Sequence, residues 1–187
     1  MNKTDKRPLY GLIVGGAAIG LAASLLQLID KLVHIKNPTA NLACNVSSVF
    51  NCSGVLDAWQ SSFFGFPNSI MCIIFFAIIL GVAIAGATGS VLSKGLRLVM
   101  QFFSVFFLAF GAWYLWQSIY AIGAVCIYCM FCYAAVIAIN FSWVRINVLD
   151  LPFSEFKQKL IKRNWDVVIW LLWASVFVVM IITRFYL

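Results

Sequence analysis

The sequence predicts an all-α integral membrane protein, a four-helix transmembrane bundle with an additional fifth span at the C-terminal end. Of the 187 residues, 64% are hydrophobic and only 10% are charged, which leaves too little polar surface for a water-soluble domain. Apolar runs of about 20 residues, the length of a helix that crosses a bilayer, alternate with shorter polar segments. We therefore expect one compact helical bundle and no separate soluble domain.

The apolar runs predict spans over residues 9–29, 67–88, 98–120, 122–144 and 167–183. The first follows a basic start and is longer than the apolar core of a signal peptide, so we interpret it as an uncleaved span. Its glycines either form a small-residue packing face or are simple filler: Gly11, Gly15, Gly16 and Gly20. Pro67 stands where a first helical turn tolerates proline. The third span ends in a predicted interfacial aromatic belt of Trp113, Tyr114, Trp116 and Tyr120.

Residues 30–66 are predicted to form one extended loop, because no apolar run there is long enough to cross a bilayer. Within the loop, apolar side chains recur at helical spacing, which predicts a short amphipathic helix: Val49, Cys52, Val55, Leu56 and Trp59. This helix would turn Cys52 inward and leave Cys44 on the preceding, more mobile segment.

The distribution of Lys and Arg predicts the topology. With a cytoplasmic N-terminus, ten basic residues fall inside: Lys3, Lys6, Arg7, Lys94, Arg97, Arg145, Lys157, Lys159, Lys162 and Arg163. Only Lys31, Lys36 and Arg184 fall outside. This bias accounts for the net charge of +7 without a nucleic-acid partner.

Two cysteine pairs carry the predicted chemistry. Cys126 and Cys129, three residues apart at the start of the fourth span, share a helix face, and the free N–H groups and dipole of a helix N-terminus can stabilise a thiolate there. Cys44 and Cys52 lie in the polar loop, where cysteine is not core filler. The predicted topology brings both pairs to the external, oxidising face, where thiols exchange disulfides. The two other cysteines, Cys72 and Cys132, are interpreted as small apolar filler within the spans.

These residues carry a family resemblance. Cys44 and Cys52 followed by Ser53, then Asn68-Ser69-Ile70, and Cys126-Ile127-Tyr128-Cys129 with Tyr133 four residues on, resemble the vitamin K epoxide reductase family and its bacterial disulfide-forming homologues. The resemblance covers roughly residues 9–144. It implies a four-helix membrane domain around a quinone over residues 1–144. The composition predicts that a charged, cytoplasmic connector and a fifth transmembrane helix follow over residues 145–187.

The resemblance also implies a role for each cysteine of the two pairs. Cys126 and Cys129 would form the active-site disulfide, with Cys129 facing the quinone. Cys44 would take electrons from a thioredoxin-like partner, and Cys52 would pass them to Cys126.

Three further residues are candidates for binding the quinone. Asn68 and Tyr133 match positions that hydrogen-bond quinone carbonyls in the family. Tyr133 follows Cys129 by one turn, so its hydroxyl can donate to an acceptor beside that sulfur, although ordinary aromatic packing is the alternative. For Asn68 the alternative is a helix-end cap or a polar contact with a neighbouring helix. Trp59 either closes the pocket or anchors the chain at the interface.

The chain departs from the family pattern in two places. The serine or threonine expected six residues after the second loop cysteine is Ala58 here, with Ser61 and Ser62 nearby. A fifth span stands where many bacterial members carry a fused thioredoxin-like domain.

The sequence thus predicts a membrane thiol–disulfide oxidoreductase that passes electrons from a periplasmic or lumenal thioredoxin-like protein to a ubiquinone, menaquinone or vitamin K type quinone, supporting disulfide bond formation. A bacterial plasma membrane is the expected location. One alternative is a vitamin K epoxide or quinone reductase that runs on partner thiols along the same path. Others are a structural or electron-carrying protein whose cysteines bind zinc or an iron–sulfur cluster, and a transporter or scaffold with incidental thiols.

Overall fold

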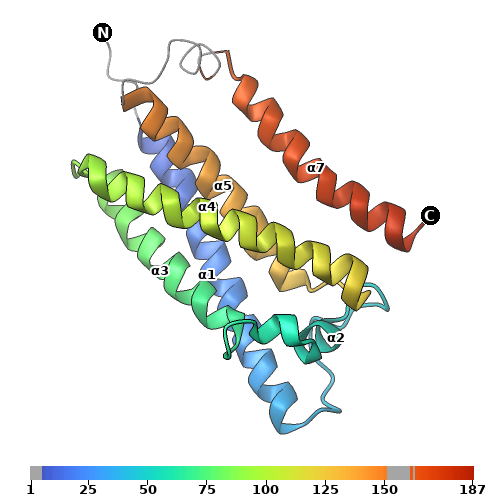
Figure 1. The fold of residues 1–187 in the computed structure, drawn as a ribbon. Coiled ribbons are helices and arrows are strands. Elements are labelled where there is room, and N and C mark those ends of the chain that lie inside the picture. Colours follow the sequence, from blue (N-terminus) through green and yellow to red (C-terminus); the bar gives the residue numbers. More distant parts are fainter. Residues whose placement is uncertain (1–5, 151–160, 162) are drawn as a thin grey trace.

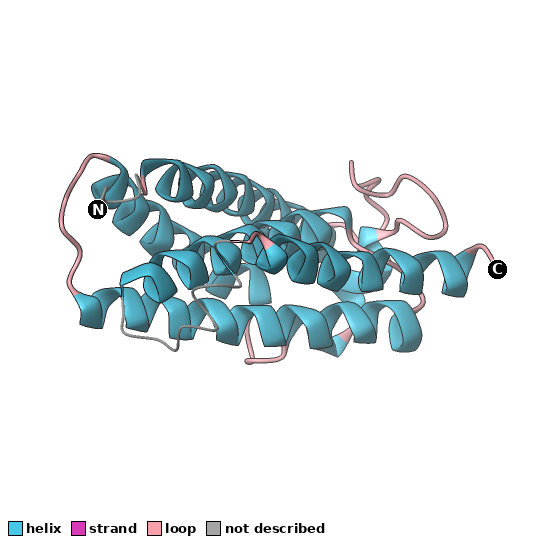
Figure 2. Ribbon diagram, turned by 90° about the horizontal axis from the view of Figure 1, so that it is seen from above, coloured by secondary structure: helices cyan, strands magenta, loops and turns pink. Residues whose placement is uncertain are grey.

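The computed structural model describes residues 6–150, 161 and 163–187, and all of its regular elements there are helical apart from one isolated β-bridge. Figure 1 and Figure 2 show the long helices side by side. The long helices are α1 (Arg7–Lys36), α3 (Asn68–Ala87), α4 (Lys94–Gln117), α5 (Ile127–Asp150) and α7 (Trp165–Phe185). Three short elements are α2 (Cys52–Asp57), the 3₁₀ turn η1 (Trp59–Ser62) and the π-helical turn η2 (Ser118–Ile122), which continues α4.

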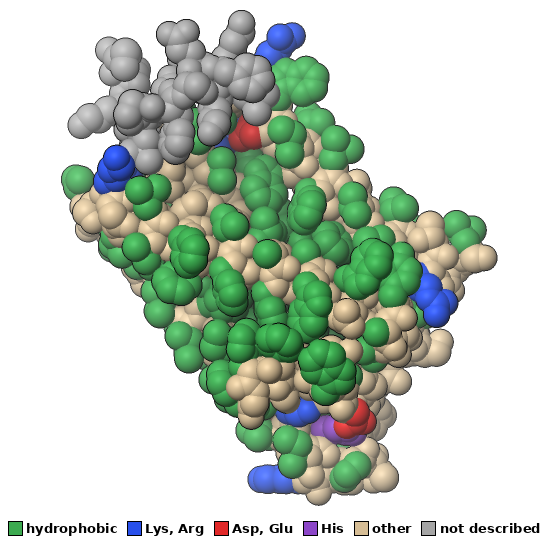
Figure 3. All heavy atoms as spheres, viewed as in Figure 1, with side chains coloured by type: hydrophobic (Ala, Val, Ile, Leu, Met, Phe, Trp, Pro, Cys, Tyr) green, Lys and Arg blue, Asp and Glu red, His purple; other side chains and the backbone are tan. Residues whose placement is uncertain are grey.

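The predicted fold class is confirmed. Five described helices are long and apolar enough to cross a membrane. In Figure 3 hydrophobic side chains cover most of the visible face, while most of the charged side chains gather toward its ends. A protein that exposes so many large apolar side chains along its helices is stable only in a lipid environment. The chain is therefore an integral membrane protein.

Two span boundaries differ from the sequence prediction, each for a local reason. The first helix does not stop near residue 29 but continues to Lys36, and Asn37 is extended (φ −141°) because Pro38 disfavours a helical residue before it. The fourth span begins at Ile127 instead of residue 122. Gly123, with φ +75°, ends the preceding η2 turn and starts a short extended segment.

Helix α1 is the centre of the bundle and packs against α3 and α5, while α4 packs against α5. Only two of the four α1 glycines make close contacts. Gly16 faces the carbonyl of Ala135, and a Cβ on Gly20 would collide with the ring of Phe76. Gly11 and Gly15 have no such neighbour. The predicted small-residue packing face is thus confirmed for Gly16 and Gly20 only.

Helix α7 lies on the outside of the bundle and contacts α5 and η2 (Figure 1). Its first turn is joined to α5 by Arg145, which donates to both carboxylate oxygens of Asp166 at 2.5 and 2.8 Å and to Asn164 Oδ1 at 2.7 Å. Planar, bidentate pairing of this kind fixes orientation as well as distance. Four basic residues of the predicted inner side lie outside the described residues: Lys3, Lys157, Lys159 and Lys162.

The amphipathic helix of the loop is present but shorter than its pattern. Asn51 caps α2 by accepting a hydrogen bond from the Gly54 N–H at 3.2 Å. Cys52 is buried as predicted, together with Val55 and Leu56. Trp59 lies beyond the helix with 64% of its surface exposed.

Candidate thiol and quinone site

The two cysteine pairs meet at one end of the bundle. Cys44 and Cys52 form a disulfide, whereas Cys126 and Cys129 are free thiols. The Sγ atom of Cys52 lies 3.4 Å from that of Cys126. Sulfur atoms at this separation are in van der Waals contact, so one can attack the other without a large movement of the chain.

A short backbone pairing brings Cys52 to Cys126. Phe50 and Val125 form a parallel β-bridge, and the Val125 N–H donates to the Val49 carbonyl at 2.8 Å. The extended backbone after Gly123 makes this pairing possible. The hydroxyl of Ser118 also donates to the Ala124 carbonyl at 2.5 Å, which holds the segment against η2.

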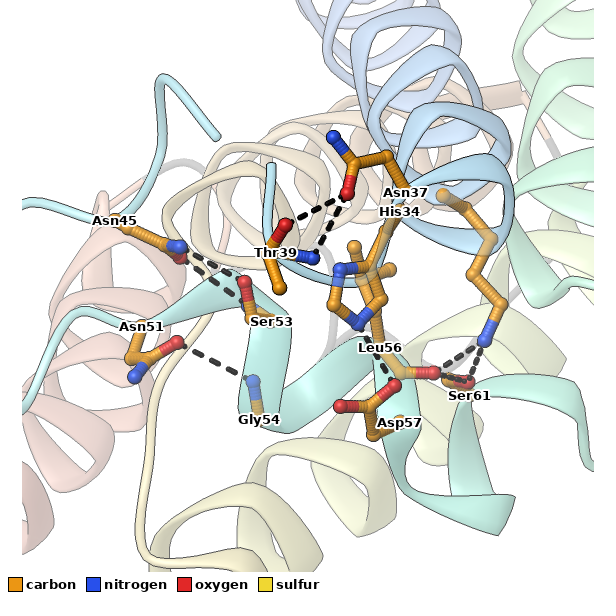
Figure 4. A network of polar contacts seen from close by, with 11 residues as sticks. His34, Asn37, Thr39, Asn45, Asn51, Ser53, Gly54, Leu56, Asp57 and Ser61 are labelled. Atoms are coloured by element: carbon orange, nitrogen blue, oxygen red, sulfur yellow. Dashed lines mark hydrogen bonds and ion pairs between the residues drawn. The ribbon is translucent and has the colours of Figure 1, made fainter. Parts of the chain in front are cut away.

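A polar network fastens α2 to the end of α1 (Figure 4). His34 Nε2 lies 2.8 Å from Asp57 Oδ1, and Lys31 donates to the Leu56 carbonyl and, at 3.2 Å, to Ser61 Oγ. These α1 residues belong to the segment that the sequence analysis assigned to the loop. Their helical position explains why α2 is held against the bundle.

Both sulfurs of the loop disulfide are buried. The exposed fraction is 0% for Cys52, as predicted, and 2% for Cys44, which the sequence analysis placed on a more mobile segment. Asn45, next to Cys44, binds Ser53 through two hydrogen bonds of 2.8 and 3.2 Å and closes the eight-residue loop. A protein substrate can therefore reach Cys44 only if this segment moves outward.

Asp30 is a residue of the site that the sequence analysis did not identify. Its Oδ2 atom lies 3.3 Å from Cys44 Sγ. The available signal was an acidic residue directly after an apolar run, because ionisable groups at membrane depth are rare outside functional sites.

The surroundings of Cys126 favour its thiolate. Its pKa is lowered from the ordinary value, first because the Cys129 thiol hydrogen-bonds the sulfur and then because the backbone N–H groups of Cys129 and Tyr128 do the same. Burial and the charge of Asp30 oppose this shift. The N–H contribution agrees with the prediction made from the helix N-terminus.

A cavity within the bundle opens beside Cys129. The Nε2 atom of Gln27 donates to Cys129 Sγ at 3.2 Å. The cavity, termed the Cys129 cavity below, is lined by Gln27, Asn68, Ser69, Cys72, Phe76, Phe107, Phe110, Gly111, Tyr114, Leu115, Cys129, Cys132, Tyr133 and Val136. Gln27 was also missed by the sequence analysis, although a lone amide in an apolar run is a signal of a polar partner.

A family model described as the vitamin K epoxide reductase family matches residues 11–144. The chain belongs to this family. It is accordingly a membrane oxidoreductase of the thiol–disulfide and quinone type. No curated protein sequence matches the chain. Within the described residues, no three His, Cys, Asp or Glu side chains are grouped so that they could hold a metal ion.

Two of the three candidate quinone residues of this vitamin K epoxide reductase family member line the cavity. Tyr133 lines the cavity, and its hydroxyl accepts a hydrogen bond from Trp173 Nε1 at 2.9 Å. Asn68 also lines the cavity, and most of its amide is already engaged, because it donates to the Gln60 carbonyl at 2.6 Å and accepts from the Phe63 N–H at 3.2 Å. Its amide therefore has one N–H left for a ligand.

Trp59 does not line the cavity. Its ring packs on Phe63 and Trp113, with ring centroids 6.1 and 6.4 Å away, and Phe63 in turn contacts the cavity residue Phe110. Ser61, which is near Ala58 where the chain lacks the serine or threonine of the family pattern, likewise does not line the cavity. Its hydroxyl donates to the Leu56 carbonyl at 2.8 Å.

Tyr114 supplies the test of whether a quinone fits. This side chain was expected in an interfacial belt, but it is 7% exposed and lines the cavity. Its hydroxyl has no hydrogen-bond partner among the described residues. A buried hydroxyl without a partner costs roughly 1–3 kcal/mol, so a carbonyl acceptor in the cavity would satisfy it. The mostly aromatic and aliphatic lining suits a quinone ring.

The filler cysteines Cys72 and Cys132 also line the cavity. The sulfur of Cys132 lies 3.7 Å from the Gly20 carbonyl and 3.9 Å from Ser24 Oγ. Spacing within α5 places Cys132 one turn after Cys129, whereas the position of Cys72 beside them depends on how α3 and α5 face each other.

Proposed function

We propose that the protein passes electrons from a thioredoxin-like protein through the Cys44 and Cys52 pair, then the Cys126 and Cys129 pair, to a quinone, and so supports disulfide formation. The observation that carries this proposal is the 3.4 Å contact between Cys52 and Cys126. Together with a loop disulfide and two free thiols, it matches the arrangement expected just after electrons have crossed between the pairs.

The relay consists of two disulfide exchanges. A partner dithiol reduces the Cys44–Cys52 disulfide, leaving an oxidised partner and two loop thiols. The Cys52 thiolate then attacks Cys126 of the Cys126–Cys129 disulfide, and Cys129 leaves as a thiolate. Attack by Cys44 on Cys52 restores the loop disulfide and releases Cys126. Two electrons have then moved inward, and no other oxidant is required.

Asp30 fits the role of proton acceptor for Cys44. Resolution of the mixed disulfide requires a Cys44 thiolate, and the carboxylate lies 3.3 Å from that sulfur. A general base must be within hydrogen-bonding reach of the proton it removes.

At the inner end, the chain positions one sulfur and several donors. Gln27 donates to Cys129 and stabilises its thiolate. The hydroxyls of Tyr114 and Tyr133 and the free N–H of Asn68 are the donors that would hold the carbonyls of a bound quinone. The quinone supplies the electron sink, since it takes up two electrons and two protons.

The proposed orientation puts both cysteine pairs on the external face of a bacterial plasma membrane, with the N-terminus inside. The described basic residues of the predicted inner side lie toward the opposite end of the bundle from Cys126: Lys6, Arg7, Lys94, Arg97, Arg145 and Arg163. A variant with Cys44 as its only cysteine tests this orientation. Membrane-impermeant maleimide should label it from outside, and labelling only after the inner face is opened would refute the placement.

The electron path is tested with two electron donors. We expect Cys44→Ala to lose oxidation of a thioredoxin-like protein but to keep quinone reduction by dithiothreitol, which is small enough to reach the inner pair. Cys126→Ala and Cys129→Ala should lose both activities. Because loss of the loop disulfide costs roughly 2–3 kcal/mol in the chain-entropy model, folding is checked first. Oxidation of the protein partner by folded Cys44→Ala at the parental rate would contradict the relay.

A further inference from the structure

Helix α7 is connected to the Cys129 cavity by one hydrogen bond. Trp173 Nε1 donates to the Tyr133 hydroxyl at 2.9 Å. An indole nitrogen is a donor only, so the hydroxyl must accept here, and its own proton remains free for another acceptor. Tyr133 lines the cavity. The contact therefore selects the state in which Tyr133 is a donor toward the cavity.

The Tyr133 ring is confined from both sides. On the α4 side it lies against Gly111, where an added Cβ would be 2.6 Å from the ring atom Cδ2. On the α7 side it makes an edge contact with Phe177, with ring centroids 4.9 Å apart. Phe177 makes the same kind of contact with Trp173. The ring thus has one position, and the indole fixes its hydroxyl.

The seating of α7 supports this contact. Asp166 and Trp173 are seven residues apart, which places them two turns apart on one helix face. Asp166 is anchored by Arg145 of α5, the helix that also carries Tyr133. Helix α7 lies beyond residues 11–144, which the family model matches.

We propose that α7 completes the quinone site and that Trp173 is a positioning residue for Tyr133. The inference rests on the proposed quinone reduction. In this arrangement Trp173 does not touch the quinone. It holds the Tyr133 hydroxyl so that the O–H group points to a quinone carbonyl, and it strengthens that donor by hydrogen-bonding its oxygen.

The test compares Trp173→Phe with Trp170→Phe in the full-length protein. Phenylalanine keeps an aromatic ring facing Phe177 but removes the indole N–H and part of the ring volume, and Trp170→Phe makes the same chemical change elsewhere on α7. Trp170 is on the same helix and makes no hydrogen bond or ring contact with Tyr133, although it borders an outer groove with Trp173. With dithiothreitol and a soluble ubiquinone analogue, we expect Trp173→Phe to raise the quinone KM about three- to tenfold, the effect of one neutral hydrogen bond, with a smaller change in kcat. Trp170→Phe should match the parent.

A second readout does not depend on turnover. At a fixed quinone concentration, quinone binding raises the melting temperature by an amount that grows with the logarithm of the affinity, and we expect this rise to shrink in Trp173→Phe but not in Trp170→Phe. In a Tyr133→Phe background, Trp173→Phe should have no further effect on KM or on the melting shift, because its target hydroxyl is gone. Trp173→His, which retains an N–H donor, should recover part of the affinity.

The outcomes separate the two proposals. If the parent protein binds and reduces no quinone, the proposed function fails. If the parent is active but Trp173→Phe behaves like Trp170→Phe, the positioning role is wrong. Additive effects of Trp173→Phe and Tyr133→Phe would also overturn it, since they would show that the indole acts through general packing.

Discussion

The shuttle end of the molecule, defined here as the C-terminal end of α1, segment 37–51, α2 and Cys126, differs from the Cys129 cavity in how its polar groups are used. At the shuttle end nearly every polar side chain of the α1 terminus is engaged, as in the pairs of His34 with Asp57 and Lys31 with Leu56. In the cavity the Tyr114 hydroxyl has no partner among the described residues. Among the described residues of the shuttle end, the one unpaired ring atom, His34 Nδ1, belongs to a side chain that already binds Asp57, whereas in the cavity the whole Tyr114 hydroxyl is left for a ligand.

This difference follows from the two transfers proposed. Exchange between sulfurs requires contact and access, so the polar groups serve to dock α2 with Cys52 against Cys126. Reduction of a quinone requires a bound acceptor held in one orientation, so donors must remain available. Substitutions at the shuttle end should therefore change turnover mainly with a protein as electron donor. Substitutions in the cavity should change quinone reduction with either electron donor.

The largest expected effect is an all-or-none cross-link. In Cys44→Ala/Cys129→Ala, Cys52 and Cys126 are left as neighbours 3.4 Å apart, and mild oxidation should join them almost completely. In Cys44→Ala/Cys126→Ala, Cys52 should remain a free thiol. Peptide mapping by mass spectrometry measures both products. Equal cross-linking in the two variants would mean that the docked position of α2 does not select Cys126.

The next effect separates the electron donors. Asp30→Asn should slow oxidation of a thioredoxin-like protein by roughly 100-fold, the usual contribution of a general base, and shift the rate profile to higher pH, because Cys44 must then lose its proton to solvent. Dithiothreitol-driven turnover should change little. Asp57→Asn is the control, since this carboxylate binds His34 and contacts no sulfur. A similar loss in both variants would assign Asp30 a docking role only.

A smaller effect is expected within the cavity. Gln27→Leu removes the donor to Cys129, and a hydrogen bond to a charged sulfur is worth about 1.5–3 kcal/mol. We expect at least a roughly tenfold fall in kcat for quinone reduction with either electron donor. Gln101→Leu is the matched control, because Gln101 donates to Asn140 and does not line the cavity. An unchanged kcat in Gln27→Leu would show that Cys129 needs no help from this amide.

The steric fit of Tyr133 gives a weaker effect. Gly111→Ala places a Cβ 2.6 Å from the Tyr133 ring and should displace the ring, raising the quinone KM about threefold, part of one hydrogen bond. Gly95→Ala, on the same helix with nothing within 4 Å, should have no effect. Steady-state kinetics at several quinone concentrations distinguishes the two. A normal KM in Gly111→Ala would imply that the Tyr133 position is not critical.

The sequence predicted the features that are determined by residues near one another in the chain, and it missed those that depend on how distant helices pack. The five spans and the inward face of Cys52 follow from composition and periodicity, and the placement of a cysteine pair at a helix start follows from its spacing. The resemblance implied a disulfide between Cys126 and Cys129, whereas the structure has both as free thiols. Tyr114 shows the limit: its neighbours suggested an interfacial belt, whereas Trp116 and Tyr120 are exposed and Tyr114 turns inward. The helical positions of Phe107 and Gly111, seven and three residues before Tyr114, carried the correct signal.

The sequence could not predict contacts between helices that are distant in the chain. The approach of Asp30 to Cys44 arises because α1 continues past residue 29 and α2 folds back on it. The hydrogen bond from Trp173 to Tyr133 depends on where α7 docks. Neither distance can be obtained from spacing within one helix.

The smallest expected effect concerns Cys72 and Cys132, which line the cavity without a disulfide partner. Alanine at either position removes one sulfur from a partly filled space, and we expect a loss of stability of about 1 kcal/mol or less with quinone reduction retained. Cys132→Ala should cost more than Cys72→Ala, because Cys132 is more deeply buried and its sulfur approaches the Gly20 carbonyl. Thermal unfolding and dithiothreitol-driven turnover measure the two properties separately. Complete loss of turnover in a folded Cys132→Ala protein would make this thiol part of the redox path, and the electrons would then leave Cys129 through a second sulfur before reaching the quinone.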